Sequence, residues 1–302
     1  MVIKKNIPIK YLFSKVRTEF YLIIIYVIGF EVVDLSVDLA FLAIPISLPT
    51  TLGTAISIIL AFRVNQAYAR WWEARKVWGE IVNESRTLVR QLLTLVRRDS
   101  KGRLHPLIKD MAYRQIAWTY SLGQSLRGQD PLGSLETFLS AEERTALQNQ
   151  KNVPNALLLT QASSLALLYR TKHLTDYQLV QIDQTHSKLC NSMGKCERIK
   201  NTVFPAQYSL IIEILLGLFI FLLPLGMLSI SMHFVLPIIL AITLLFFLIE
   251  NTSELLQDPF ENRPTDTPVT AIAKTIEINI RQMLAEQEIP EKQAVSEEYY
   301  LM

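Results

Sequence analysis

Four residues at helical spacing along one apolar segment could line a passage for ions. They are separated by four, four and three positions: Thr54, Ile58, Phe62 and Asn65. If helices from several subunits surround an axis with this stripe inward, Ile58 and Phe62 form a hydrophobic constriction, with Asn65 returning polar contacts beyond it. Such a constriction gates by dewetting, because an ion loses its hydration shell and gains no substitute ligands. Side chains that face lipid or the protein core would give the same pattern, so the spacing leaves both interpretations open.

Acidic residues in two other apolar segments could also act on ions. Glu31, Asp34 and Asp38 fall three and four positions apart, on one face of a helix. They could line a water-filled vestibule that concentrates cations, or Asp34 and Asp38 could lie at the level of the lipid headgroups. Glu213 is a candidate for a buried ion pair or a proton site, and equally for a side chain that extends to the interface.

No set of residues predicts enzyme chemistry or metal binding. The four histidines lack the spacing of metal ligands, and the chain has no phosphate-binding loop, dinucleotide loop or nucleophile elbow. Cys190 and Cys196 lie six apart on one expected helix, which is poor geometry for a disulfide, so we expect both to be reduced. We therefore expect no catalytic residues, no metal, no cofactor and no nucleic-acid partner.

The segments that position these residues are those of a membrane protein. The chain has 302 residues, of which 50% are hydrophobic and only 19% charged, and its mean hydropathy is +0.24. About 20 residues are needed to cross ~30 Å of hydrocarbon. Four apolar segments are candidates: 20–37, 41–62, 208–228 and 234–249. Pro45 and Pro49 predict that the second begins with a turn and that its helix continues past Phe62.

Basic residues predict how the chain is oriented. Lys4, Lys5, Lys10, Lys15 and Arg17 precede or open the first segment, whereas 31–54 and 229–233 contain no Lys or Arg. The positive-inside rule then places both termini of a multi-pass membrane protein in the cytoplasm. No chloroplast transit peptide is visible, so we expect the cell's inner (plasma) membrane. Four parts follow: an N-terminal cytoplasmic segment with membrane helices 1 and 2 (1–62), a cytoplasmic helical region (63–204), membrane helices 3 and 4 (205–256) and a C-terminal cytoplasmic segment (257–302).

The cytoplasmic region is predicted to be all-helical, with helices expected over 107–126 and 154–170. A further helix is expected over 272–284, in the C-terminal segment. Ser140 with Glu143, and Thr175 with Gln178, have the spacing of capping boxes that begin helices. Beyond Thr175, steps of three and four predict a seam for another helix, from this chain or from a neighbouring subunit. The seam consists of Leu179, Ile182, His186, Leu189 and Met193.

Arginine and tryptophan are dense directly after the second apolar segment, at Arg63, Arg70, Trp71 and Trp72. Their ordinary interpretation is an interfacial belt, with Trp at headgroup depth and Arg on phosphate. In an assembly, Arg70 could instead join neighbouring subunits through charge-assisted bonds to Glu73 or Glu80.

Several of these stretches together resemble the bestrophins, in the shorter form typical of bacteria. The strongest match is residues 61–91, AFRVNQAYARWWEARKVWGEIVNESRTLVRQ, with Arg70-Trp71-Trp72 at its centre. Weaker matches follow in the expected order: Cys196-Glu197-Arg198-Ile199, Asp258-Pro259-Phe260 and Thr275-Ile276-Glu277-Ile278-Asn279. The resemblance covers nearly the whole chain. It implies an all-α membrane protein with four transmembrane helices per subunit and a helical cytoplasmic region, assembled as a homopentamer around a central pore.

The resemblance also implies where the pore is narrow. Family neck residues lie four apart before the Arg-Trp-Trp, and counting back from Arg70 places Phe62, Ile58 and Thr54 at them. The helical stripe selects the same three residues. A second, cytoplasmic aperture falls at Tyr177, or at Leu174 if the preceding loop differs.

Two departures from the family pattern affect function. Thr54 is polar where the outermost neck residue is usually large and apolar, so the outer ring is expected to be wider and wetter. The run of acids that holds calcium in animal members is missing after Phe260, so we expect no calcium dependence.

The function expected from the resemblance is passive conduction of small monovalent ions, either chloride or cations such as sodium. Glu31, Asp34 and Asp38 favour cations, whereas the excess of Arg and Lys over 63–204 favours anions. The alternatives are a secondary transporter coupled through Glu213, and a non-conducting membrane scaffold.

Overall fold

The computed structural model describes residues 17–37, 39–133, 135–202, 205–228, 230 and 232–292. Asp38 and the four N-terminal lysines used to orient the chain lie outside these residues. Across the described ranges the regular structure is helical throughout, without a strand, which confirms an all-α protein. Within these described ranges, four helices are long and apolar enough to cross a membrane: Arg17–Val37, Ser47–Leu95, Gln207–Leu225 and Phe234–Gln257.

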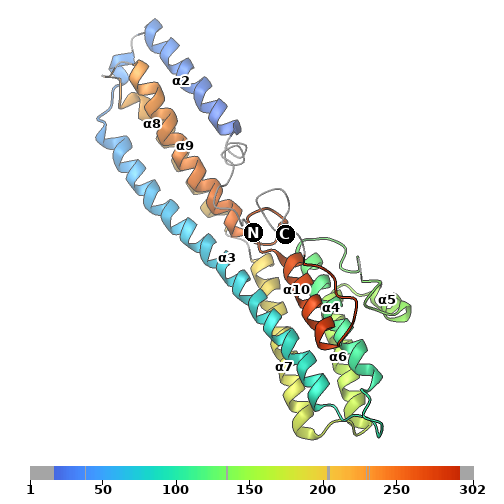
Figure 1. Ribbon diagram of the computed structural model, residues 1–302. Helices are drawn as coiled ribbons and strands as arrows, with labels where there is room; N and C mark the ends of the chain where they lie inside the picture. The colour runs from blue at the N-terminus through green and yellow to red at the C-terminus, as the bar shows by residue number, and fades with distance from the viewer. Residues whose placement is uncertain are drawn as a thin grey trace. The chain divides into compact units, whose positions relative to one another are not determined.

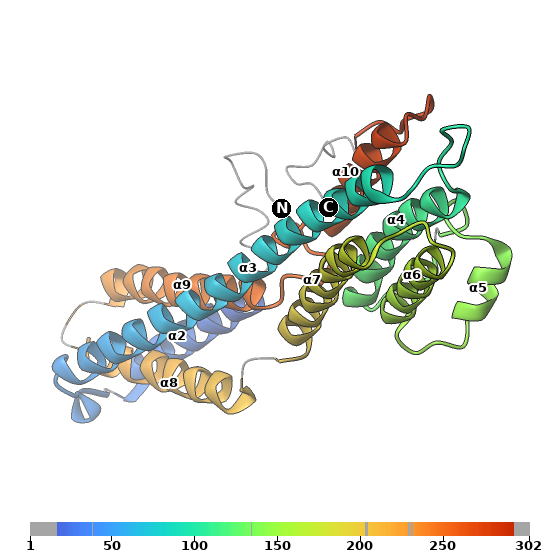
Figure 2. The same ribbon diagram turned by 90° about the horizontal axis from the view of Figure 1, so that it is seen from below.

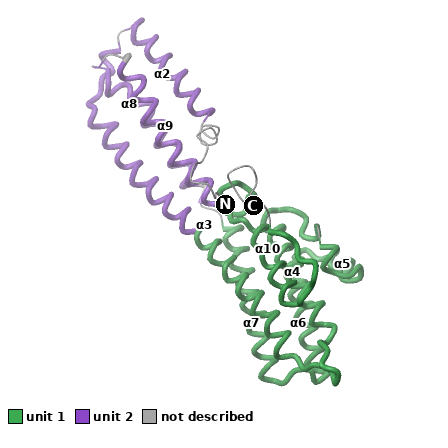
Figure 3. Tube along the Cα trace, viewed as in Figure 1, with its two compact units in different colours: residues 1–3, 72–202, 259–302 green, residues 4–71, 203–258 purple. Residues whose placement is uncertain are grey.

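The chain forms two compact units, shown in purple and green in Figure 3. We call residues 4–71 and 203–258 the membrane unit, and residues 1–3, 72–202 and 259–302 the large unit. The helix α3 (Ser47–Leu95) supplies residues to both, because it continues without a break through the Arg-Trp-Trp sequence. The prediction that the second apolar segment runs on as one long helix is therefore confirmed.

In the described residues, the membrane unit contains four helices, and Figure 1 shows how they run. They are α2 (Arg17–Val37), the first part of α3, α8 (Ala206–Leu225) and α9 (Met232–Gln257), and a short 3-10 turn η1 (Leu39–Leu42) follows α2. The helix α9 packs against both α2 and α8. The turn predicted before α3 is present, and Pro49 lies in the first turn of α3, where no intrahelical N–H donor is needed.

Among its described residues, the large unit contains the rest of α3 and five further helices, which Figures 1 and 2 show from two sides. These are α4 (Pro106–Leu126), α5 (Ala141–Leu147), α6 (Val153–Arg170), α7 (Asp176–Asn201) and α10 (Val269–Met283). The helix α4 packs against both α6 and α10, and α6 packs against α7. Trp78 and Trp118 are fully buried in the resulting core.

Both predicted capping boxes are formed. The Ser140 hydroxyl accepts a bond from the Glu143 N–H at 3.2 Å, and the Glu143 carboxylate accepts one from the Ser140 N–H at 3.4 Å. At the start of α7, the Thr175 N–H donates to Gln178 Oε1 at 2.9 Å. Each bond satisfies a donor that the first helical turn would otherwise leave unpaired.

The seam predicted on α7 is filled within this chain. Ile182 and Leu189 are fully buried, and with Met193 they join the core that α4 and α6 contribute to. His186 lies on the same face and is 7% exposed. A neighbouring subunit is therefore not required to cover this face.

Candidate ion-conduction site

The first part of α3 has one buried face and one exposed face. Ile56 and Leu60 are 1% exposed and belong to the core of the membrane unit. Ile58 and Phe62 point away from that core and are 55% and 63% exposed. Thr54 is exposed on the same side, and its hydroxyl donates to the Thr50 carbonyl at 2.9 Å. The chain's own helices thus leave the predicted stripe uncovered.

A glycine allows α3 to approach α8 closely. A Cβ atom at Gly53 would lie 2.9 Å from the ring atom Cε2 of Phe219, closer than side chains tolerate. Phe219 is itself buried and stacks edge-on against Phe246 of α9, with ring centroids 5.3 Å apart. Gly53 therefore contributes to the fixed orientation of α3 one residue before Thr54.

Arg63 follows Phe62 and points into the membrane unit. Its Nη1 lies 3.0 Å from Glu250 Oε1 on α9, and its Nη2 donates to the Ser209 hydroxyl on α8 at 3.2 Å. Arg63 is only 3% exposed, so the expectation that it lies in an interfacial belt on lipid phosphate is wrong. The helical phase decides this outcome, because residue 63 falls on the same face as Leu60 and Ala67, which are both buried.

Arg70 caps a helix of the membrane unit. Its Nε donates at 3.0 Å to the carbonyl of Gln257, the last residue of α9, which is one of the acceptors that a helix end leaves unpaired. In the large unit, Glu73 pairs with Arg198 and Glu80 pairs with Lys195, both at 2.9 Å. Both acids therefore join α3 to α7 of the same chain.

Two hollows flank the exposed face of α3. Thr54 and Ile58 border one of about 520 Å³ that reaches Phe219 and Phe246. Asn65 and Tyr68 border another of about 510 Å³ against α9. Asn65 thus lies on the accessible side of α3, as a residue following the stripe would.

The structure describes two of the three acids predicted for a vestibule, Glu31 and Asp34 of α2. Asp34 accepts a bond from the Leu39 N–H at 2.9 Å, which ties the end of α2 to the turn η1. Glu31 is half-buried on the same helix. Asp34 therefore has a structural role that the sequence pattern did not indicate.

The two candidates for the second aperture differ strongly in exposure. Tyr177 lies in the first turn of α7 and is 90% exposed. Leu174 lies just before that helix, is 5% exposed and belongs to the core of the large unit. Only Tyr177 presents its side chain to a space outside the chain.

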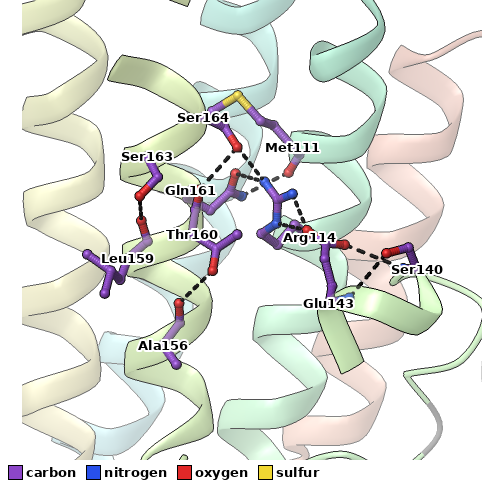
Figure 4. A network of polar contacts seen from close by, with 10 residues as sticks. All are labelled: Met111, Arg114, Ser140, Glu143, Ala156, Leu159, Thr160, Gln161, Ser163 and Ser164. Carbon is purple, nitrogen blue, oxygen red and sulfur yellow. Dashed lines mark hydrogen bonds and ion pairs between the residues drawn. The ribbon is translucent and has the colours of Figure 1, made fainter. Parts of the chain in front are cut away.

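A buried polar network, shown in Figure 4, joins three helices of the large unit. Arg114 of α4 binds the Glu143 carboxylate of α5, and its Nη1 donates to the Ser164 hydroxyl of α6 at 3.1 Å. Gln161 completes the network by donating to the Met111 carbonyl at 2.8 Å. Sequence reasoning missed it, although an Arg on the apolar face of a helix is a signal for such a network, because a buried charge needs polar partners.

The ionisable side chains of His186 and Cys196 are buried in the large unit. Burial among apolar residues lowers the pKa of His186 to about 4, although nearby Asp183 acts in the opposite direction. Burial also raises the pKa of the Cys196 thiol, which keeps that thiol protonated at neutral pH. Both cysteines are free, as predicted. Among the described residues, no three His, Cys, Asp or Glu side chains come together as a metal site would require.

Comparison with known proteins agrees with the resemblance seen in the sequence. A family model of the bacterial and fungal bestrophin proteins matches residues 12–282. The voltage-dependent anion channel-forming protein YneE of Escherichia coli O157:H7 is 34% identical over 251 residues, which cover 83% of this chain and 80% of YneE. The voltage-dependent anion channel-forming protein alr2987 of Nostoc is 32% identical over 250 residues, or 79% of each chain.

A solved structure matches as well. The bacterial bestrophin homologue from Klebsiella pneumoniae superimposes with a TM-score of 0.80 at 27% identity, covering 92% of this chain and all of that one. The family model, the relatives and the fold therefore agree along nearly the whole sequence. This chain belongs to the bestrophin family, in its bacterial and fungal branch.

Proposed function

We propose that the chain forms a passive channel for small monovalent anions, with five copies arranged around one axis and with Thr54, Ile58 and Phe62 lining the neck. The observation that carries the proposal is the exposure of Ile58 and Phe62 on a helix whose opposite face is packed. Apolar side chains in a ring would make ion passage depend on wetting of the neck. Bestrophins are channels rather than enzymes, which agrees with the lack of a catalytic pattern.

The sign of the ion is inferred from the relatives and from the acids. The relatives named above are called anion channel-forming proteins. Of the acids that would favour cations, Asp34 directs one carboxylate oxygen to the Leu39 N–H of its own chain. Chloride is the simplest anion of this class.

The remaining parts of the proposal follow the same logic. Thr54 would give a wider and wetter outer ring, Asn65 polar contacts beyond the neck, and Tyr177 a second aperture. Burial of Arg63 and the four candidate spans support insertion in a bilayer, which we propose is the inner (plasma) membrane with both termini cytoplasmic.

Currents from the purified protein in planar bilayers test conduction and selectivity together. Under a tenfold KCl gradient, the reversal potential should move toward the chloride equilibrium potential, at most about 59 mV from zero. Movement toward the potassium equilibrium potential would overturn the anion assignment, and slow flux without unitary current steps would indicate a transporter. A mass measurement in detergent should give five copies, and a stable monomer or dimer would contradict the assembly.

Replacing neck side chains by alanine distinguishes a stripe that faces the pore from a stripe that faces lipid. Ile58→Ala and Phe62→Ala should raise conductance or open probability, because five bulky apolar groups leave the ring at once. Leu60→Ala is the matched control on the buried face of the same helix, where it should destabilise by about 2–5 kcal/mol without raising current. Unchanged current from a well-assembled Ile58→Ala/Phe62→Ala double variant would remove the neck assignment.

A further inference from the structure

We propose that an open pocket between α3 and α10 in the large unit binds a phosphate-bearing small molecule. The pocket has a volume of about 580 Å³. It is lined by two arginines, three uncharged polar residues and one apolar residue: Arg86, Arg90, Thr87, Asn279, Gln282 and Met283. No acid lines it, so the positive charge of the two guanidinium groups is not compensated there.

The two arginines lie one helical turn apart on α3. Residues four apart on a helix are neighbours, with about 5–6 Å between their Cβ atoms. Within the described residues, neither Arg86 nor Arg90 forms an ion pair. Two like charges at this spacing repel each other and weaken the helix slightly. An anion placed between them would remove that repulsion.

The acids of the surrounding helices are already paired. On α3, Glu80 lies 2.9 Å from Lys195 and Glu84 lies 3.6 Å from Lys188, so both carboxylates turn toward α7. On α10, Glu277 binds both Lys274 and Arg281, at 2.9 and 3.0 Å. The acids nearest in sequence are thus engaged with other cations, and Arg86 and Arg90 remain available to a ligand from solution.

Asn279 orients one of the arginines. Arg86 Nε donates to Asn279 Oδ1 at 2.8 Å, which fixes the plane of the guanidinium group. A carboxamide carries no charge, so this bond positions Arg86 without neutralising it. The two terminal amino groups of Arg86 keep their N–H donors for a second partner.

This donor set fits phosphate better than a simple halide. The planar fork of a guanidinium group matches the oxygens of phosphate in a two-point contact. The Thr87 hydroxyl and the Gln282 carboxamide add uncharged donors, and Met283 offers an apolar contact for an organic part. A pocket of this volume falls in the range used by small organic ligands. The ligand class is therefore a phosphate ester of about nucleotide size.

Binding to the full-length protein in detergent tests the site, with phosphate, pyrophosphate and AMP as probes at constant ionic strength. Adenosine is the control that lacks phosphate. We expect the phosphate-bearing probes to bind in calorimetry and to raise the unfolding temperature, and adenosine to do neither. Arg90→Gln and Arg86→Gln should each weaken binding at least tenfold, the loss expected for one charge-assisted hydrogen bond. Asn279→Ala should weaken it less.

A matched control separates a site from general attraction to a basic surface. Arg170 is exposed and unpaired in the described structure but lies at the end of α6, outside the pocket. Arg170→Gln should leave binding unchanged. Equal weakening by Arg170→Gln, or binding that survives in the Arg86→Gln/Arg90→Gln double variant, would overturn the proposal. Failure of all three probes to bind the unsubstituted protein would also overturn the proposal. Disassembly of the double variant would overturn it as well, because it would assign the two arginines to contacts between copies of the chain. Because no current is measured, this outcome is independent of the channel proposal.

Discussion

The Arg63–Glu250 ion pair allows a direct test of how α3 is held in the membrane unit. The Arg63 and Glu250 side chains are 4% and 13% exposed, and Nη1 and Oε1 lie 3.0 Å apart. Glu250→Gln preserves the size and one acceptor oxygen of the side chain, but it removes the negative charge. Among the described residues, Arg63 would then keep hydrogen bonds to neutral groups alone, the Ser209 hydroxyl and the new amide.

The expected loss follows from the burial of the pair. Removing one partner of a buried ion pair typically destabilises a protein by about 3–5 kcal/mol. Because Gln keeps a hydrogen-bond acceptor near Arg63, we expect the lower end, about 3 kcal/mol, which is roughly a hundredfold fall in the ratio of folded to unfolded protein. The Arg63 Nε has no hydrogen-bond partner among the described residues, so no further hydrogen bond from this atom offsets the loss of the Glu250 carboxylate.

Denaturant unfolding of the variants in one detergent provides the measurement. Glu254→Gln is the matched control, because Glu254 is exposed one turn further along α9 and its neutralisation should change stability by less than about 0.5 kcal/mol. The Arg63→Met/Glu250→Leu double variant should recover most of the loss, since apolar pairs often replace buried ion pairs without penalty. If Glu250→Gln unfolds like Glu254→Gln, the pair does not hold α3 and the reasoning fails.

Two further outcomes are expected. His186 has a pKa of about 4 in the folded chain against its usual 6.5, so below pH 6.5 the unfolded chain takes up a proton that the folded chain excludes. The free energy of unfolding should therefore be unaffected by His186 above pH 6.5 and should fall by at most about 3 kcal/mol as the pH is lowered toward 4. In thermal unfolding, His186→Leu should show a flatter dependence on pH than the unsubstituted protein. Parallel pH profiles would assign the dependence to other groups. Conductance should not need calcium, because Glu261 pairs with Lys200 and the Asp266 carboxylate accepts the Arg263 N–H. Currents abolished by a calcium chelator and restored by calcium would contradict this.

The helices of this protein were predictable because their signals are local. Capping boxes at Ser140 and Thr175 satisfy donors within one turn, and hydrophobic length alone predicts the four candidate spans. The long helix α3 was predictable for the same reason, since no Gly or Pro interrupts residues 54–78. Local chemistry decides such features before any tertiary contact forms.

Partners distant in the sequence were not predictable from spacing. Arg63 and Glu250 are 187 residues apart, and Arg114 meets Glu143 and Ser164 across three helices. Each arginine was visible in the sequence, but which carboxylate reaches it depends on how the helices pack. For the same reason, the sequence indicated that the seam on α7 is buried. It did not indicate whether helices of this chain or of a neighbouring subunit cover the seam.

The orientation of α3 about its own axis connects the buried contacts to the proposed neck. Adjacent residues on a helix point about 100° apart, so Phe62 cannot face the core while Arg63 binds Glu250. At the other end of the stripe, the close contact of Gly53 with Phe219 imposes the same rotation one residue before Thr54. A substitution that disrupts either contact would let α3 turn and move Ile58 and Phe62 together. Glu250→Gln should therefore alter current as well as stability, whereas a lipid-facing stripe would leave conductance unaffected by the same rotation.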